Sequence, residues 1–157
     1  MSLALVRVDD RLIHGQVVVG WANALNIDRI LLIDDHVCAN QWERDLYRMG
    51  VPAGMQVEFA SAEGAAAILD EWIKARERSI VVVADIETLT RLCNSTDVVQ
   101  KVNIGGVHDG DGRKRRLPYV FLSDDELETL RAMSARGIEV TAQDVPTARA
   151  VPLVEIE

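Results

Sequence analysis

The chain has little of several residue types that define whole classes of protein. Only two of its 157 residues are cysteine, and Cys38 and Cys93 stand far apart, without a Cys-x-x-Cys spacing. This argues against a disulfide framework and indicates reduced thiols in a cytoplasmic protein. Aromatic residues make up 4% of the chain. The core is therefore expected to consist of valine, isoleucine, leucine and alanine, as in a parallel sheet buried between helices.

Long apolar runs and an excess of basic residues are absent as well. No run approaches the roughly 20 residues of a membrane span. The N-terminus has no basic region followed by an apolar stretch, so no signal peptide is expected. The net charge of −8 argues against nucleic-acid binding through a broad basic face. The one basic cluster, Arg113–Arg116, is interpreted either as a solvated loop or as a docking patch for an acidic partner or a membrane surface.

What the chain does have is a regular alternation of strand-like and helix-like segments. Strands are expected at Leu3–Val8, Arg29–Ile33, Met55–Ala60, Ser79–Ala84, Lys101–Ile104, Tyr119–Leu122 and Ile138–Ala142. Helical spacing lies between them, with Asn40, Ser61 and Ser123 as expected N-caps and Gly137 as an expected C-terminal signal; the segment 107–116 is expected to be a loop. This alternation predicts one α/β domain, residues 1–157, with a mainly parallel sheet covered by helices on both faces.

Polar or glycine-containing segments follow four of the expected strands. They are the loop that ends in His14, the pair Asp34–Asp35, the pair Ala84–Asp85, and the pair Gly105–Gly106. Because the carboxyl ends of parallel strands meet at one edge of a sheet, all four are expected on one rim, where α/β proteins bind ligands. His108 follows the glycine pair and is interpreted either as part of this rim or as an ordinary polar loop residue. His36 is expected at the surface or at the start of a helix.

The loop before the first helix carries the residues best suited to chemistry. His14 stands between the first strand and a helix whose free backbone N–H groups, at Gly15, Gln16 and Val17, favour an anion. Arg11 can add a two-pronged phosphate contact. A neutral imidazole is a competent nucleophile near pH 7, so this arrangement is suited to phosphoryl transfer.

The acidic residues of this loop have two possible roles. Asp10, or Asp9, can hold the second imidazole nitrogen of His14, and the other carboxylate can bind Arg11. A lone loop histidine beside an Asp-Asp-Arg string is, by itself, more often a solvated surface feature. No set of histidine, cysteine and carboxylate residues has a convincing metal-ligand spacing, so neither a metal nor another cofactor is expected.

The ten residues 8–17, VDDRLIHGQV, closely resemble the active-site loop of the IIB subunits of the mannose/fructose/sorbose family of the sugar phosphotransferase system (PTS). The resemblance extends over nearly the whole chain through Val102–Gly106, His108, 112–114, Ala135–Val140 and Val145–Thr147. It implies that His14 is phosphorylated, and it suggests Nδ1 as the phosphorylated atom. It also implies an open twisted sheet of about seven strands, with one antiparallel edge strand.

The same resemblance implies partners and a location. A IIA subunit or domain would donate the phosphoryl group, and a hexose imported by the IIC and IID membrane subunits would accept it. The chain would then be a cytoplasmic phosphotransferase held at the inner face of the plasma membrane. One position departs from the family: Asp85 follows the fourth strand, where a hydroxyl or amide residue followed by proline is common. Its carboxylate would repel a phosphate, unless it points away to cap the next helix.

Other functions fit the sequence less well. A regulatory module derived from a IIB domain, which senses phosphorylation without transport, is an open alternative. A response-regulator receiver needs an aspartate after its third strand, where this chain has Glu58–Ala60. No Gly-x-Gly-x-x-Gly or Walker loop follows a strand, which argues against a nucleotide-binding fold. The tryptophans at 21, 42 and 72 are expected in the core or a groove; an exposed tryptophan would favour a docking surface.

Overall fold

The computed structural model describes residues 2–156, except for the side chains of Gln16, Val17 and Val19. The strands are β1 Leu3–Val8, β2 Arg29–Ile33, β3 Gln56–Ala60, β4 Ser79–Val83, β5 Lys101–Ile104, β6 Lys114–Leu117, β7 Val120–Leu122, β8 Glu139–Ala142 and β9 Val151–Pro152. The helices are α1 Gly15–Leu25, α2 Asp35–Ala39, α3 Gln41–Met49, α4 Ala65–Trp72, α5 Ile86–Ser95, α6 Asp124–Ala135 and a 3-10 turn at Leu153–Glu155.

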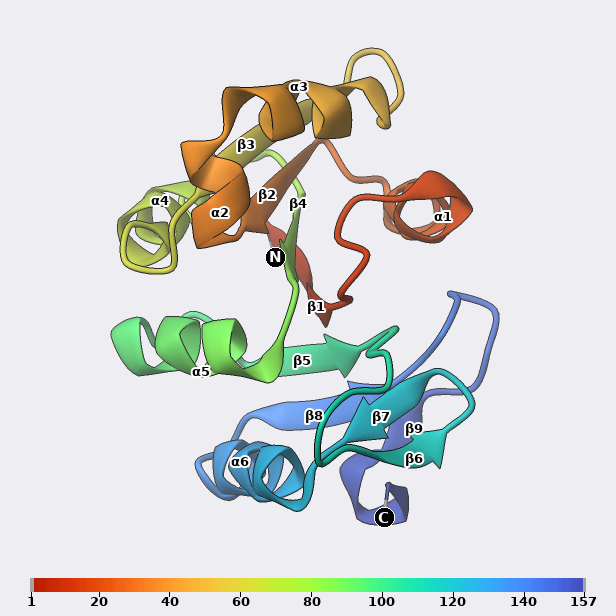
Figure 1. Ribbon diagram of the computed structural model, residues 1–157. Coiled ribbons are helices and arrows are strands. Elements are labelled where there is room, and N and C mark those ends of the chain that lie inside the picture. Colours follow the sequence, from red (N-terminus) through yellow and green to blue (C-terminus); the bar gives the residue numbers. More distant parts are fainter. Residues whose placement is uncertain (1, 157) are drawn as a thin grey trace.

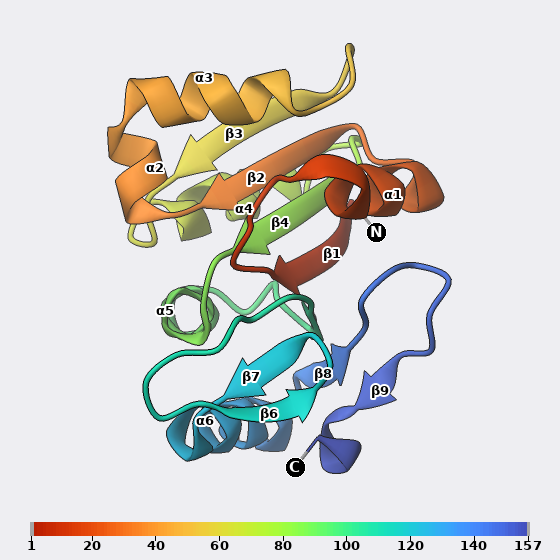
Figure 2. The same cartoon turned by 45° about the vertical axis from the view of Figure 1, so that its right-hand side comes forward.

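The main sheet confirms the predicted α/β fold. Its seven strands lie in the order β3-β2-β4-β1-β5-β8-β9, and every neighbouring pair is parallel except the antiparallel edge pair β8 and β9. Helices cover both faces, as the two ribbon views make clear (Figure 1, Figure 2). Strands β2, β3 and β4 lie on one side of β1, and β5 and β8 lie on the other. The chain therefore changes sides at β1, and the loop after β1 lies at a topological switch point.

Burial on both faces explains the apolar strands in the middle of the sheet. Each residue of β4 is buried, as are four of the five residues of β2. One core cluster joins the sheet to α4, α5 and α6, with Leu69, Leu89 and Leu130 among its fully buried members. The other joins the opposite face to α1 and the α2–α3 segment, through residues such as Val18 and Val37. Uninterrupted apolar runs are what such doubly covered parallel strands require.

Several local expectations are confirmed in atomic detail. Ser123 and Glu126 form a reciprocal capping box at the start of α6. Asn40 accepts a hydrogen bond from the backbone of Glu43 at 3.2 Å, which caps α3. Gly137 has φ +97° just beyond α6, a conformation that favours glycine. These caps satisfy backbone groups that the helix ends leave without partners.

The region 107–122 differs from the expectation. The segment Tyr119–Leu122 does contain a strand, but β7 pairs with β6 in a separate antiparallel hairpin rather than with the main sheet. The expected loop at the basic cluster is therefore partly strand β6. Three of its side chains are paired: Arg113 with Glu126, and both Lys114 and Arg116 with Asp124. These ion pairs neutralise much of the cluster, which weakens its interpretation as a docking patch for an acidic partner.

Two helix starts were also missed. The short helix α2 begins directly after β2, because Asp34 accepts a hydrogen bond from the backbone of Val37 and caps it. The helix expected after Ser61 begins later, at Ala65, with Gly64 at the N-cap position. Ser61 accepts a hydrogen bond from the backbone of Gly64 at 3.0 Å, so it stabilises the preceding turn instead.

Candidate active site at the rim of the sheet

The loop between β1 and α1 is held from both sides by the neighbouring strand ends. The backbone N–H of Asp9 donates to Val83 at 2.9 Å, and that of Asp10 donates to Gly106 at 2.9 Å. Leu12 donates to Asp9 within the loop and has φ +58°, a left-handed conformation that is costly for a side chain of this size. Burial of Leu12 offsets this strain, and the turn sets the direction in which the chain enters α1.

His14 occupies the N-cap position of α1, where its side chain makes no capping hydrogen bond. Its Nδ1 lies 3.1 Å from the carbonyl oxygen of Leu12, and its Nε2 is buried without a hydrogen-bond partner. A phosphoryl group can reach Nε2 only if the ring becomes exposed, and Nδ1 only if the contact with Leu12 is released. In this arrangement neither ring nitrogen of His14 is open to a ligand.

Asp9 is a buried carboxylate between two arginines. Its Oδ1 accepts hydrogen bonds from the backbone and from Nε of Arg11, both at 3.1 Å, and its Oδ2 lies 3.2 Å from Nη2 of Arg11. Arg7 approaches the same Oδ2 at 3.4 Å from the other side. The side chain of Asp9 is fully buried, whereas that of Arg11 is 38% exposed. Asp9 therefore fixes the guanidinium of Arg11 while leaving part of it open to a ligand, as expected for the carboxylate that binds Arg11.

Arg7 is the main participant that sequence reasoning missed. Its guanidinium donates to the side chain of Asn103 and lies over the ring of Trp21. It also donates to two carbonyl oxygens, those of Gln143 and Asp144, both at 2.8 Å. Burial lowers the pKa of Arg7, and the carboxylate of Asp9 opposes that effect. The signal was present in the sequence, because an arginine within an otherwise apolar central strand needs a buried partner.

The glycine pair after β5 makes room for both arginines. A Cβ atom built on Gly105 would lie 2.3 Å from Nη2 of Arg7, and one built on Gly106 would lie 3.0 Å from Nη2 of Arg11. Real Cβ contacts are not found at the first of these distances. The pair therefore lies against both arginines, and the missing side chains permit each guanidinium group to approach the backbone closely.

Asp10 does not contact the ring of His14. Its carboxylate binds His108 instead, through the backbone N–H at 2.7 Å and through Nδ1 at 2.6 Å. These contacts of Asp10 fix the loop after β5 against the loop after β1, and within the former Arg113 donates to the carbonyl oxygen of His108 at 3.0 Å. The contact on the His14 ring comes from the Leu12 carbonyl, whereas Asp10 or Asp9 had been expected to hold it.

The other expected rim residues lie further along the same edge. Asp35 accepts a hydrogen bond from the backbone of Ala62 and pairs with Arg91, and both contacts lower the pKa of Asp35. It follows β2, which is two strands away from β1, a separation of about 10 Å. Ala84, directly after β4, is partly buried and packs against the core. Asp85 accepts a hydrogen bond from the backbone of Thr88 at 2.7 Å and caps α5, which confirms that interpretation of the departure from the family.

The arrangement around the start of α1 is suited to binding a dianion. The backbone of Gly15, Gln16 and Val17 forms the first turn of the helix, although the side chains of Gln16 and Val17 lie outside the described part. Gly15 has no heavy atom within 4 Å of its Cβ position, so the approach to this end of the helix is open. A helix N-terminus, a half-exposed Arg11 and a histidine together provide positive potential and a nucleophile.

Two further properties of residues 2–156 bear on the chemistry. In that range, no group of three or more histidine, cysteine or acidic residues is arranged to hold a metal ion. No helix among the same residues is long and apolar enough to cross a membrane. The site described above consists of ordinary side chains and backbone groups.

Comparison with known proteins gives a consistent result. The family model of the PTS system sorbose subfamily IIB component matches residues 3–156. The N-acetylgalactosamine-specific phosphotransferase enzyme IIB component 1 of Escherichia coli is 28% identical, with 92% of each chain covered. The IIBSor domain of the sorbose permease from Klebsiella pneumoniae superimposes with a TM-score of 0.90 at 28% identity, covering 99% of this chain and 96% of that one.

A further relative is longer than this chain. The mannose-specific EIIAB component of Escherichia coli is 28% identical over 147 residues, which are 94% of this chain but 46% of the relative. The chain thus spans about half the length of this and similar EIIAB relatives. The chain belongs to the sorbose-subfamily IIB components of the sugar phosphotransferase system, a family of phosphotransferases that act in sugar transport.

Proposed function

We propose that His14 accepts a phosphoryl group from a IIA phosphohistidine and passes it to a hexose that the IIC and IID membrane subunits import. The observation that carries this proposal is the position of His14 at the N-terminus of α1, three residues after an Arg11 that the buried Asp9 holds in place. Within the cell, the chain would work in the cytoplasm, at the inner face of the plasma membrane.

The chemistry needs little beyond positioning and charge. An unprotonated nitrogen of His14 attacks the donor's phosphorus, a new N–P bond forms, and the N–P bond to the donor histidine breaks. In the second step a sugar hydroxyl attacks the same phosphorus and the bond to His14 breaks; the proton that the hydroxyl loses balances the one that the released imidazole takes up. Arg11 and the first N–H groups of α1 offset the charge on the phosphoryl oxygens in both steps. Before the first transfer the imidazole turns away from the Leu12 carbonyl, its contact in the resting arrangement.

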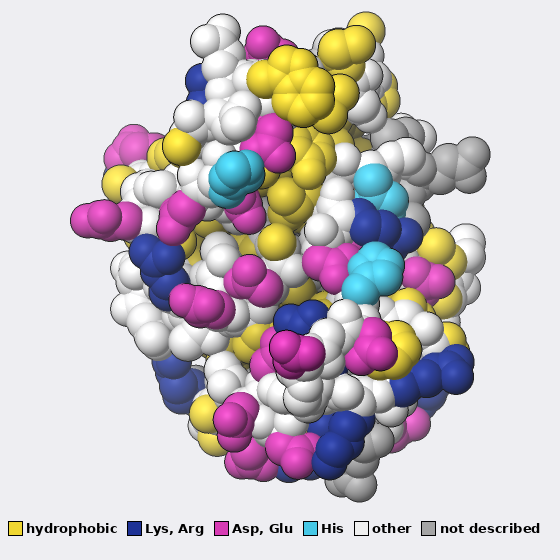
Figure 3. All heavy atoms as spheres, viewed as in Figure 1, with side chains coloured by type: hydrophobic (Ala, Val, Ile, Leu, Met, Phe, Trp, Pro, Cys, Tyr) yellow, Lys and Arg dark blue, Asp and Glu magenta, His cyan; other side chains and the backbone are white. Residues whose placement is uncertain are grey.

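An exposed apolar stripe supports an encounter with partner proteins. Trp42, Leu46 and Met49 lie along α3 and are 73%, 51% and 82% exposed. Hydrophobic side chains gather over α3 on the face that also displays histidine side chains (Figure 3). The expectation that all three tryptophans are core or groove residues is therefore wrong for Trp42. Exposed aromatic and methionine side chains are characteristic of protein interfaces, and we assign this stripe to the relay partners.

The proposal is tested by intact-mass analysis. The protein is incubated with phosphoenolpyruvate, the general phosphotransferase proteins and a mannose-family IIA protein, whose own charging is verified in the same tube. The expected result is a gain of one acid-labile phosphate, followed by its loss when membranes with the cognate IIC and IID subunits and their sugar are added. No gain in the presence of charged IIA would contradict the proposal.

Arg11→Ala should slow transfer much more than it destabilises the fold. Loss of one charge-stabilising donor in a transfer site typically lowers the rate by about 100-fold. The cost in stability should be about 1–2 kcal/mol, because Asp9 keeps its contact with Arg7. Single-turnover phosphorylation and urea unfolding measure the two effects. Arg149→Ala, which removes an exposed arginine paired with Glu155, is the control and should change neither the transfer rate nor the stability by much. Equal transfer rates for Arg11→Ala and the wild type would exclude a role of Arg11 in stabilising the phosphoryl charge.

A further inference from the structure

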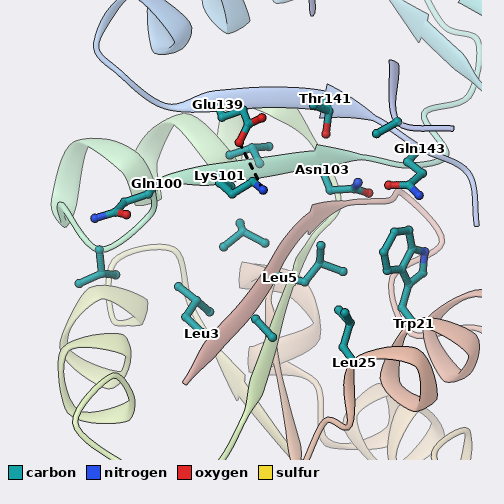
Figure 4. A pocket seen from close by; sticks show the side chains of 15 residues that line it. Leu3, Leu5, Trp21, Leu25, Gln100, Lys101, Asn103, Glu139, Thr141 and Gln143 are labelled. Carbon is teal, nitrogen blue, oxygen red and sulfur yellow. Dashed lines mark ion pairs between the residues drawn. The ribbon is translucent and has the colours of Figure 1, made fainter. Parts of the chain in front are cut away.

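A hollow lies on the sheet face that carries α1, away from the His14 loop. Its volume is about 320 Å³, within the usual range for small-molecule sites. Helix α1 packs on this face over β1, β4 and β2, whereas among the described residues no helix lies above β5 and β8, so a cavity remains beside α1 (Figure 1, Figure 4). The function proposed above makes no use of it.

The cavity has one apolar wall and one polar wall. Leu3 and Leu5 of β1 and Trp21 and Leu25 of α1 form the apolar wall. The polar wall comes from side chains that alternate along β5 and β8 and point to this face: Lys101, Asn103, Glu139, Thr141 and Gln143 (Figure 4). A ligand that fills the cavity would therefore meet hydrocarbon on one side and hydrogen-bonding groups on the other.

Three groups on the polar wall have unused hydrogen-bonding capacity. Among the described residues, the hydroxyl of Thr141 and the amide nitrogen of Asn103 have no hydrogen-bond partner, and the side-chain oxygen of Gln143 accepts none. The charged pair at the far end neutralises itself, because Lys101 lies 3.3 Å from Glu139. The wall thus offers a donor amide, a hydroxyl and an acceptor oxygen, without net charge.

This lining discriminates between classes of ligand. An anion would find no unpaired cation, since Lys101 is paired and Arg7 is enclosed. A wholly apolar ligand would cover the polar wall without satisfying it, at a cost for each buried group. We propose that the cavity binds a neutral hexopyranose, whose C–H face packs on the leucines and Trp21 while its hydroxyl groups bind Asn103, Thr141 and Gln143.

The cavity is connected to the phosphate loop through Arg7. Three lining residues hold that side chain: Asn103 and Gln143 accept its hydrogen bonds, and Trp21 lies 5.2 Å from its guanidinium carbon. Arg7 in turn contacts Asp9, which fixes Arg11. A sugar that binds these residues alters the contacts that hold Arg7, and through Asp9 those that hold Arg11. Occupancy of the cavity is therefore coupled to phosphoryl transfer. This coupling rests on the function proposed above, whereas the binding itself does not.

The test uses unphosphorylated protein and three defined probes: mannose, N-acetylgalactosamine and sorbose. Heteronuclear NMR follows the indole N–H of Trp21 and the backbone amides of β5 and β8 during titration. For a ligand of this size we expect saturation of at least one sugar with a dissociation constant on the order of 1 mM. Inorganic phosphate, tested in parallel, should leave the cavity signals unchanged. Saturation of the cavity should also change the rate of His14 phosphorylation at least about twofold, which corresponds to a small coupling free energy.

Two variants and a control locate the binding. Ala150→Trp places bulk at the exposed mouth of the cavity and should abolish the titration. Thr147→Trp is the control: Thr147 is an exposed residue of the same loop that does not line the cavity, so this variant should titrate like the wild type. Thr141→Val removes one hydroxyl at constant shape and should weaken binding about tenfold.

Certain outcomes would overturn the inference. One is that none of the three sugars shifts the cavity signals at about 20 mM. Another is that the sugar titration survives in Ala150→Trp. A third is that the cavity signals depend on protein concentration alone, which would assign the hollow to a second copy of the chain. An unchanged phosphorylation rate at saturation would overturn the coupling. A failure of donor phosphorylation would not affect the sugar titration, so the two proposals fail separately.

Discussion

His14→Ala should reduce phosphate uptake from charged IIA to zero while leaving the fold intact. The side chain makes no capping hydrogen bond to α1, and its substitution should change stability by less than about 1 kcal/mol. Intact-mass analysis measures uptake, and urea unfolding measures stability. Because His14 is the proposed nucleophile, the loss should be complete rather than partial, unlike the slowing expected for a residue that only stabilises charge.

The other two histidines serve as matched controls for that experiment. His36 is an exposed residue beside Glu43, and His108 binds Asp10 on the rim. His36→Ala should accept phosphate at the wild-type rate, and His108→Ala should still accept one phosphate, even if the loop it anchors becomes looser. Phosphate that persists on His14→Ala, or that vanishes only in His108→Ala, would assign the acceptor to another residue.

Asp9→Asn should be among the most destabilising single substitutions near the rim. It keeps the shape of the side chain but removes the negative charge that faces Arg7 and Arg11, leaving the buried guanidinium of Arg7 without its anionic partner. Removal of one member of a buried ion pair costs about 3–5 kcal/mol. Urea unfolding of the purified variant measures this loss as a lower transition midpoint.

Asp10→Asn is the control, because it makes the same chemical change one residue away. Asp10 pairs with a His108 side chain that is 70% exposed, and exposed pairs contribute about 0–1 kcal/mol. A loss of similar size in both variants would mean that the charge of Asp9 has no special structural role. A small loss in Asp9→Asn would mean that the hydrogen bonds of Arg7 to backbone carbonyls are sufficient to hold it.

Much of this fold is predictable from local patterns. Strands such as Arg29–Ile33 have apolar runs that end at a charged residue, and the structure places β2 at the same bounds. The capping box at Ser123 is a short-range signal and is confirmed. The loop that ends in His14 is predictable as well, because the chain must pass from a buried strand to an amphipathic helix within a few polar residues.

The remainder depends on contacts that cross long stretches of sequence. Asp10 finds its partner at His108, 98 residues away, and Arg7 binds the side chain of Asn103, 96 residues away. No local pattern distinguishes the carboxylate that binds Arg11 from the one that binds His108. The hairpin of β6 and β7 was missed for a related reason: its first strand consists mainly of charged residues, whose pairing with α6 became apparent only in three dimensions.

Because Gly105 lies so close to Arg7, the residues that evolution can accept at positions 7 and 105 depend on each other. A methyl group at 105 would occupy the space that the guanidinium fills, so alanine there is compatible only with a shorter residue at position 7. Conversely, a chain that has lost the arginine no longer requires glycine. Across descendants of a common ancestor, the two positions should therefore change together, and a single intermediate step should be disfavoured. The structure thus imposes an order on the mutations through which this loop can diverge.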